Sequence, residues 1–213
     1  MEIYLARTQG FCAGVASAVE IVEQALAKYG SPLYVFHEIV HNTFVVRDFK
    51  ERGVIFVDDL SEVPDNERVI FSAHGVSPSV LEEAKRKNLK FVDATCPLVT
   101  KVHREAVIFS KRGYEIVLIG HKGHQELIGT SAYVKPELLH VIENEADIDA
   151  LDIDPSKTVG YLTQTTLSVS ETKTLIEKLK KRFPKAKTIE VKVTKLNPPI
   201  EGEVEKVCAV VRE

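Results

Sequence analysis

Residues 37–42, "HEIVHN", match the His-Glu-x-x-His pattern of zinc proteases. The pattern binds zinc only on a helix, where His37 and His41 would lie one turn apart and Glu38 would act as general base. The preceding "LYVF" favours a strand, and "TFVVRDFKERG" begins a helix only afterwards. We therefore expect the two histidines to flank a strand-to-helix turn, with His37 as a surface or packing residue. A zinc-dependent hydrolase that uses His37, Glu38 and His41 is the alternative.

Residues capable of chemistry also follow the other apolar runs of the chain. They are Cys12 after 2–6, His41 after 32–36, His74 after 68–73, Cys96 after 90–94, His124 and Glu126 after 114–120, and Thr165 after 158–164. Parallel α/β folds bind ligands beyond the carboxyl ends of their strands, where helix N-termini also point. We therefore expect these side chains to line a ligand-binding site.

Short apolar runs alternate with amphipathic segments, which predicts parallel sheets flanked by helices. The predicted strands cover 2–6, 32–36, 54–57, 68–73, 90–94, 114–120, 138–142 and 158–164, and the predicted helices cover 14–30, 43–53, 77–88, 97–112 and 170–183. We predict an α/β fold of two similar lobes, 1–96 and 97–187, followed by a short β tail over 188–213. The tail is predicted as a strand over 188–194, a Pro-Pro turn and a second strand that contains Cys208.

The composition excludes several classes of protein. A net charge of −3 with scattered Lys and Arg gives no nucleic-acid-binding surface. The chain lacks an apolar run of about 18 residues and a signal-peptide layout at its N-terminus, so we expect no membrane association and a cytoplasmic protein. The three cysteines form no Cys-x-x-Cys pair, and in a reducing compartment they are thiols, metal ligands or nucleophiles.

Six segments in chain order carry a resemblance to a known family: "GFCAGV", "HEIVHN", "SAHGV", "DATCPLVTKVH", "LIGHKGHQE" and "YLTQTTLSV". Over residues 1–187 they resemble the motifs of 4-hydroxy-3-methylbut-2-enyl diphosphate reductase, the enzyme that ends the non-mevalonate isoprenoid pathway. The resemblance implies three α/β lobes around a 4Fe–4S cluster held by three cysteines. It also implies reduction of an allylic diphosphate to isopentenyl and dimethylallyl diphosphate, with a donor such as ferredoxin or flavodoxin.

The resemblance implies roles for seven residues. Cys12 and Cys96 would ligate the cluster, His41, His74, His124 and Thr165 would bind the substrate, and Glu126, Thr165 and His124 would form the catalytic set. Thiolates are the usual iron–sulfur ligands, and protonated imidazoles suit a diphosphate. A carboxylic acid beside an allylic hydroxyl turns it into water, so Glu126 would deliver the proton and Thr165 would orient the hydroxyl and relay the proton.

The last residues depart from the family pattern. The third cysteine motif of the family and its later Ser-x-Asn segment do not appear in "TIEVKVTKLNPPIEGEVEKVCAVVRE". This tail resembles the C-terminal strand of dihydroneopterin aldolase, with Lys195 at the position of the catalytic lysine. We therefore expect an apparently missing third lobe and an impaired reductase, with Cys208 as a packing thiol rather than a third ligand. A non-catalytic diphosphate-binding remnant is the second alternative.

Overall fold

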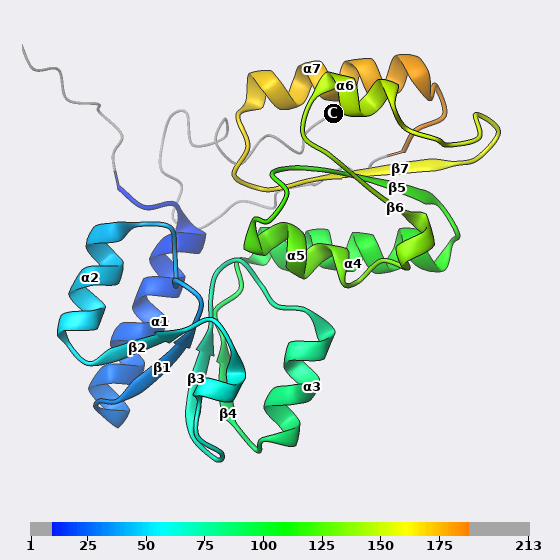
Figure 1. Cartoon of the computed structure of the whole chain (residues 1–213). Helices are drawn as coiled ribbons and strands as arrows, with labels where there is room; N and C mark the ends of the chain where they lie inside the picture. The colour runs from blue at the N-terminus through cyan, green and yellow to red at the C-terminus, as the bar shows by residue number, and fades with distance from the viewer. Residues whose placement is uncertain (1–9, 188–213) are drawn as a thin grey trace, which may run out of the picture. The chain divides into compact units, whose positions relative to one another are not determined.

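The computed structural model describes residues 10–187, which form two compact units (Figure 1). The first unit reaches Gly75 and takes in Ser79–Pro97, and the second takes in Val76–Pro78 and continues from Leu98. The predicted strand over 2–6, the predicted tail strands, Lys195 and Cys208 lie outside the described residues.

The first unit contains a four-stranded parallel sheet in the order β2-β1-β3-β4. Its strands are β1 (Leu33–Phe36), β2 (Val54–Val57), β3 (Arg68–Phe71) and β4 (Lys90–Asp93), and its helices are α1 (Ala13–Tyr29), α2 (Thr43–Glu51), η1 (Leu60–Glu62) and α3 (Pro78–Arg86). Because all four strands run the same way, the turns that follow them emerge at one edge of the sheet.

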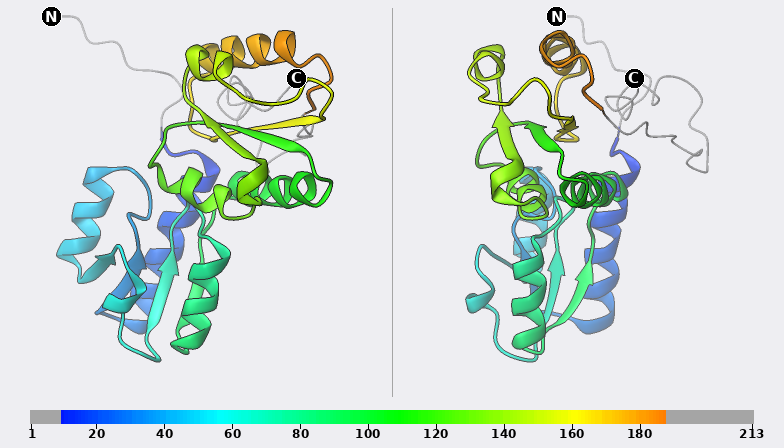
Figure 2. Two further views of the ribbon diagram at one scale, coloured as in Figure 1. Left: turned by 45° about the vertical axis from the view of Figure 1, so that its right-hand side comes forward. Right: turned by 90° about the vertical axis from the view of Figure 1, so that its right-hand side faces the viewer.

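Helix α1 is positioned by apolar residues at helical spacing. Ala18, Val22 and Ala25 are buried and share a core with Val35 of β1 and Phe49 of α2. Figure 2 shows α1 and α3 on opposite faces of this sheet. The sheet is thus covered on both sides, as its apolar strands β1 and β3 require.

The second unit contains a three-stranded parallel sheet in the order β6-β5-β7. Its elements are α4 (Pro97–Lys111), β5 (Glu115–Ile119), α5 (Gln125–Ser131), η2 (Pro136–Leu138), β6 (Leu139–Ile142), α6 (Glu145–Asp149), β7 (Val159–Thr163) and α7 (Val169–Arg182). One core joins Phe109 of α4 and Leu127 of α5 to the sheet, and another joins Ile148 of α6 and Leu179 of α7. The order β6-β5-β7 repeats the order β2-β1-β3 of the first unit, so the prediction of two similar parallel α/β lobes is confirmed.

Two short α-helices, α5 and α6, were not predicted from the sequence. Helix α5 lies between the predicted strands 114–120 and 138–142 and contains Gly129 and Thr130, which lower helix propensity. Helix α6 has only five residues and depends on Asn144, whose side chain accepts hydrogen bonds from Ala146 N and Asp147 N. Such short segments offer too few apolar positions for a period to be recognised. None of the helices in the described part of the chain is long and apolar enough to cross a membrane.

Candidate functional site

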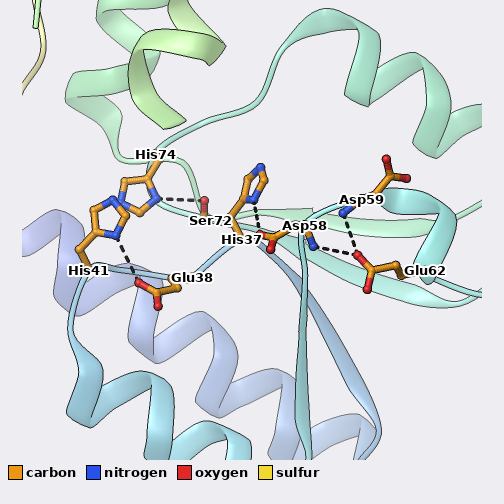
Figure 3. Close-up of polar contacts among 8 residues, drawn as sticks. All are labelled: His37, Glu38, His41, Asp58, Asp59, Glu62, Ser72 and His74. Atoms are coloured by element: carbon orange, nitrogen blue, oxygen red, sulfur yellow. Dashed lines mark hydrogen bonds and ion pairs between the residues drawn. The ribbon is translucent and has the colours of Figure 1, made fainter. Parts of the chain in front are cut away.

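The residues of the His-Glu-x-x-His pattern lie on a turn, as predicted. Strand β1 ends at Phe36 and α2 begins at Thr43, so His37 and His41 share no helix face. His37 has a left-handed backbone with φ of 59°, and its ring centroid lies 4.0 Å from that of Phe36. Its Nδ1 atom lies 3.0 Å from Asp58 Oδ1 (Figure 3). His37 is therefore a packing residue, and the helical zinc-protease arrangement is absent from this segment.

His41 and His74 form a pair of stacked imidazoles. Their ring centroids lie 4.1 Å apart, with 27° between the ring planes. His41 Nδ1 lies 3.3 Å from Glu38 Oε2, and His74 Nδ1 lies 3.3 Å from Ser72 Oγ (Figure 3). Each ring is thus oriented through its Nδ1 atom by a residue of its own turn.

Backbone hydrogen bonds fix the turns that carry these residues in register. Ala73 N donates to Ile39 O at 3.1 Å, and Cys96 N donates to Ala73 O at 3.0 Å. These bonds continue the pairing of β1 with β3 and of β3 with β4 beyond the ends of the strands. The turns after three neighbouring strands therefore form one connected platform.

Cys12 and Cys96 both lie at the N-terminal end of α1. Cys12 is the exposed N-cap residue of this helix. A Cβ atom placed on Gly14 would lie 2.6 Å from Cys96 Sγ, so the sulfur rests against the first turn of α1. Thiolates are the usual ligands of iron–sulfur clusters. Both cysteines therefore lie at one helix end, and their side-chain chemistry suits ligands of an iron–sulfur cluster. Among residues 10–187, no group of three His, Cys, Asp or Glu side chains is arranged to hold a metal ion.

In the second unit, His124 and Glu126 occupy the start of α5. His124 is the N-cap residue, and its Nδ1 accepts a hydrogen bond from Glu126 N at 3.1 Å. Because an N–H group can only donate, Nδ1 carries no proton and Nε2 carries the ring proton. The Glu126 carboxyl accepts bonds from Thr165 N at 2.7 Å and from Thr165 Oγ1 at 3.0 Å. The turns after β5 and β7 are thus joined through this carboxyl.

Glu126 is adapted to proton transfer. The residue is only 1% exposed, and burial raises the pKa of its carboxyl to about 7. The two hydrogen bonds from Thr165 lower the pKa, but burial is the larger effect. A carboxyl with a pKa near neutrality holds a proton that it can also release, which is the property of a general acid.

A cavity of about 660 Å³ also opens in the second unit, beyond the carboxyl end of β5. Its lining includes Glu143, Glu145 and Glu171 but none of the three residues just described. Three carboxylates would repel a diphosphate, so this cavity does not suit an anionic ligand.

Three residues that support the site were missed or misread from the sequence. Glu38 was considered only as a zinc-hydrolase base, whereas it contacts His41. Ser72 and Gln164 were not singled out, although both are buried and hydrogen-bonded. The sequence feature that could have indicated Ser72 and Gln164 is a polar residue at the end of an apolar run, in "VIFSA" and "VGYLTQ". A polar side chain that is buried there needs a hydrogen-bond partner.

The chain has two units of parallel α/β structure, and thiols, imidazoles and a buried acid follow their strands. These features are typical of parallel α/β proteins, which bind ligands beyond the carboxyl ends of their strands. Residues 3–201 match the family model described as LytB protein. The chain therefore belongs to the LytB family.

Relatives with assigned names agree with this membership. The chain is 51% identical over 184 residues to a 4-hydroxy-3-methylbut-2-enyl diphosphate reductase of Rhodopirellula baltica, covering 86% of this chain and 57% of the relative. It is 51% identical over 187 residues to the reductase of Pseudomonas aeruginosa, covering 86% and 60%. The structure of the Plasmodium falciparum reductase matches with a TM-score of 0.83 and 45% identity, over 86% of this chain and 57% of that one. The chain thus spans 57–60% of the length of these relatives.

Proposed function

We propose that the chain takes part in reducing 4-hydroxy-3-methylbut-2-enyl diphosphate to isopentenyl and dimethylallyl diphosphate. In this reaction the allylic C–O bond breaks, the oxygen leaves as water and a C–H bond forms, which consumes two electrons and two protons. The observation that carries the proposal is the buried Glu126 carboxyl, held by Thr165 and poised to give up a proton near neutral pH. The names of the relatives supply the substrate.

Cys12 and Cys96 would provide two thiolate ligands of a 4Fe–4S cluster at the N-terminus of α1. When bound, the cluster would pass on the two electrons, taken up one at a time from a donor, and would offer a Lewis-acidic iron to the substrate oxygen. An external protein such as ferredoxin or flavodoxin would replace these electrons. Cys208, the remaining cysteine of the chain, lies outside the described residues and is expected to be a packing thiol rather than a third ligand.

His41, His74 and His124 would bind the diphosphate. The stacked pair would donate hydrogen bonds to phosphate oxygens, and protonation of a ring would add a charge-assisted bond. His124 would donate from Nε2, because its Nδ1 is held by the backbone of α5.

Glu126 would protonate the leaving hydroxyl through Thr165. In the neutral acid, the proton on Oε2 can be donated to Thr165 Oγ1, which lies 3.0 Å away, and the threonine hydroxyl can pass its own proton on. The leaving oxygen would then depart as water rather than as hydroxide. This step leaves Glu126 as a carboxylate, which Thr165 N stabilises at Oε1.

The test combines cofactor analysis with a matched pair of variants. The chain is reconstituted anaerobically with iron and sulfide, both elements are quantified, and single-turnover reduction of the substrate is measured with a chemical reductant. Glu126→Gln keeps the shape of the side chain but removes the acidic proton, so the rate should fall by ~10²–10⁴-fold with little change in substrate affinity. Glu137→Gln makes the same change at an exposed position and should have no effect.

Two results would contradict the proposal. A near-normal rate in Glu126→Gln would place the proton source elsewhere. Zinc, or no metal, in place of iron and sulfide after anaerobic reconstitution would remove the cluster assignment. Tight substrate binding without iron and without turnover would instead support the diphosphate-binding remnant.

A further inference from the structure

Gln164 is a buried amide that the proposed chemistry does not use. It directly follows β7, and its side chain is 3% exposed. Its Oε1 accepts a hydrogen bond from His121 N at 3.0 Å, and its Nε2 donates to Thr166 Oγ1 at 2.8 Å. Its own N–H donates to Ile119 O at 2.8 Å. The residue thus contacts the last residue of β5 through its main chain and the segment after β5 through its side chain.

The backbone of the β5 segment is shaped to accept this side chain. A Cβ atom on Gly120 would lie 2.8 Å from Gln164 Oε1 and 2.9 Å from Gln164 Cβ. A larger residue at position 120 would therefore push the amide away from His121 N. The absence of a side chain at Gly120 lets the Gln164 side chain lie across the end of β5.

The two segments that Gln164 joins carry the two partners of the proton relay. The β5 segment leads within a few residues to Glu126, and Thr165 is the residue after Gln164. Both hydrogen bonds between Glu126 and Thr165 span these segments. We propose that Gln164 is a positioning residue, which holds Thr165 against Glu126 by tying the segment after β7 to the segment after β5. The catalytic meaning of this role rests on the proposed function, but the role itself concerns only contacts within the second unit.

Gln164→Met tests the role because methionine fills a similar volume but cannot accept the bond from His121 N. The readout is the carboxyl pKa of Glu126, measured by ¹³C NMR in the cluster-free chain. Burial raises this pKa to about 7 and the bonds from Thr165 lower it. His124, whose ring accepts from Glu126 N, is the titratable side chain beside it and is followed in the same titration. If the carboxyl stays buried and loses Thr165, its pKa should rise above the wild-type value.

Two further variants separate this role from general packing. Thr166→Val removes only the outer bond of the amide and should leave the Glu126 pKa unchanged, since the bond to His121 N persists. Thr165→Val removes one donor directly and should raise the pKa. In the double variant Gln164→Met/Thr165→Val, the rise should be smaller than the sum of the two single rises, because both changes act on one interaction.

The possible results are distinct. An unchanged Glu126 pKa in folded Gln164→Met, or additive effects in the double variant, would overturn the inference. A fall towards the ordinary value of 4.5 would also overturn it, because it would mean that Gln164 only keeps water from the carboxyl. The measurement needs neither cluster nor turnover, so its failure is distinguishable from failure of the proposed reductase activity. Circular dichroism of each variant confirms that the fold is kept.

Discussion

Gly14→Ala tests the placement of the proposed cluster ligands most directly. The added Cβ atom would lie 2.6 Å from Cys96 Sγ, whereas ordinary contacts begin at 3.4 Å. The sulfur must therefore move by about 0.8 Å, the difference of these two distances. Metal–ligand distances tolerate only roughly 0.2 Å. The main chain of Cys96 cannot easily follow, since its N–H is bonded to Ala73 O, so the thiol must rotate away from its position.

The same substitution should leave the cluster-free chain folded. Gly14 lies within α1 and its backbone does not adopt a left-handed conformation, so alanine fits the backbone. Alanine is more favourable than glycine in a helix by up to about 1 kcal/mol. A lower iron content together with an unchanged or higher melting temperature would therefore separate loss of the ligand position from loss of the fold.

The assay is anaerobic reconstitution followed by desalting and quantification of iron and sulfide per chain. The rate at which a chelator removes iron is measured alongside. We expect the effective affinity to fall by about 10–100-fold, as when the support of a metal ligand is removed. Ala16→Ser adds one atom at an exposed position of the same helix and should retain the wild-type iron content. Wild-type iron content and release rate in Gly14→Ala would show that Cys96 does not ligate iron from this position.

Two further predictions concern Glu126 and Cys208. Folding raises the pKa of Glu126 from 4.5 to about 7. Between pH 4.5 and about 7, the folded state therefore still holds the carboxyl proton that the unfolded chain has released. The free energy of unfolding should therefore fall by up to about 3 kcal/mol as the pH rises from about 4.5 through about 7. Urea unfolding of Glu126→Gln should lack this pH-dependent loss of stability. Parallel curves of unfolding free energy against pH for the two proteins would contradict the prediction. Cys208→Ser should leave the iron content unchanged, and loss of iron in this variant would identify Cys208 as the third ligand.

Much of the site followed from the order of strands and reactive residues in the sequence. Glu126 and Thr165 were predicted to follow two strands of one sheet, and they meet because those strands, β5 and β7, are neighbours. The turn under His37 and His41 was predictable because an apolar run of strand type precedes it and the helix begins only after Asn42.

Other features depend on packing that no local pattern records. Glu126, whose burial raises its pKa, lies in α5, a helix too short to recognise in the sequence. The approach of Cys96 to Gly14 joins residues 82 positions apart and depends on how α1 lies against β4 and its turn. The contact of Gln164 with His121 N likewise became visible only when β5 and β7 were placed side by side.

The bonds from Ala73 N to Ile39 O and from Cys96 N to Ala73 O have a consequence for how this platform can be altered. Main-chain groups form them, so any residue type except proline can supply the donor. At positions 73 and 96 these bonds therefore do not depend on the identity of the side chain. For protein engineering, position 96 is a place where a ligand other than cysteine can be installed while this main-chain bond is kept.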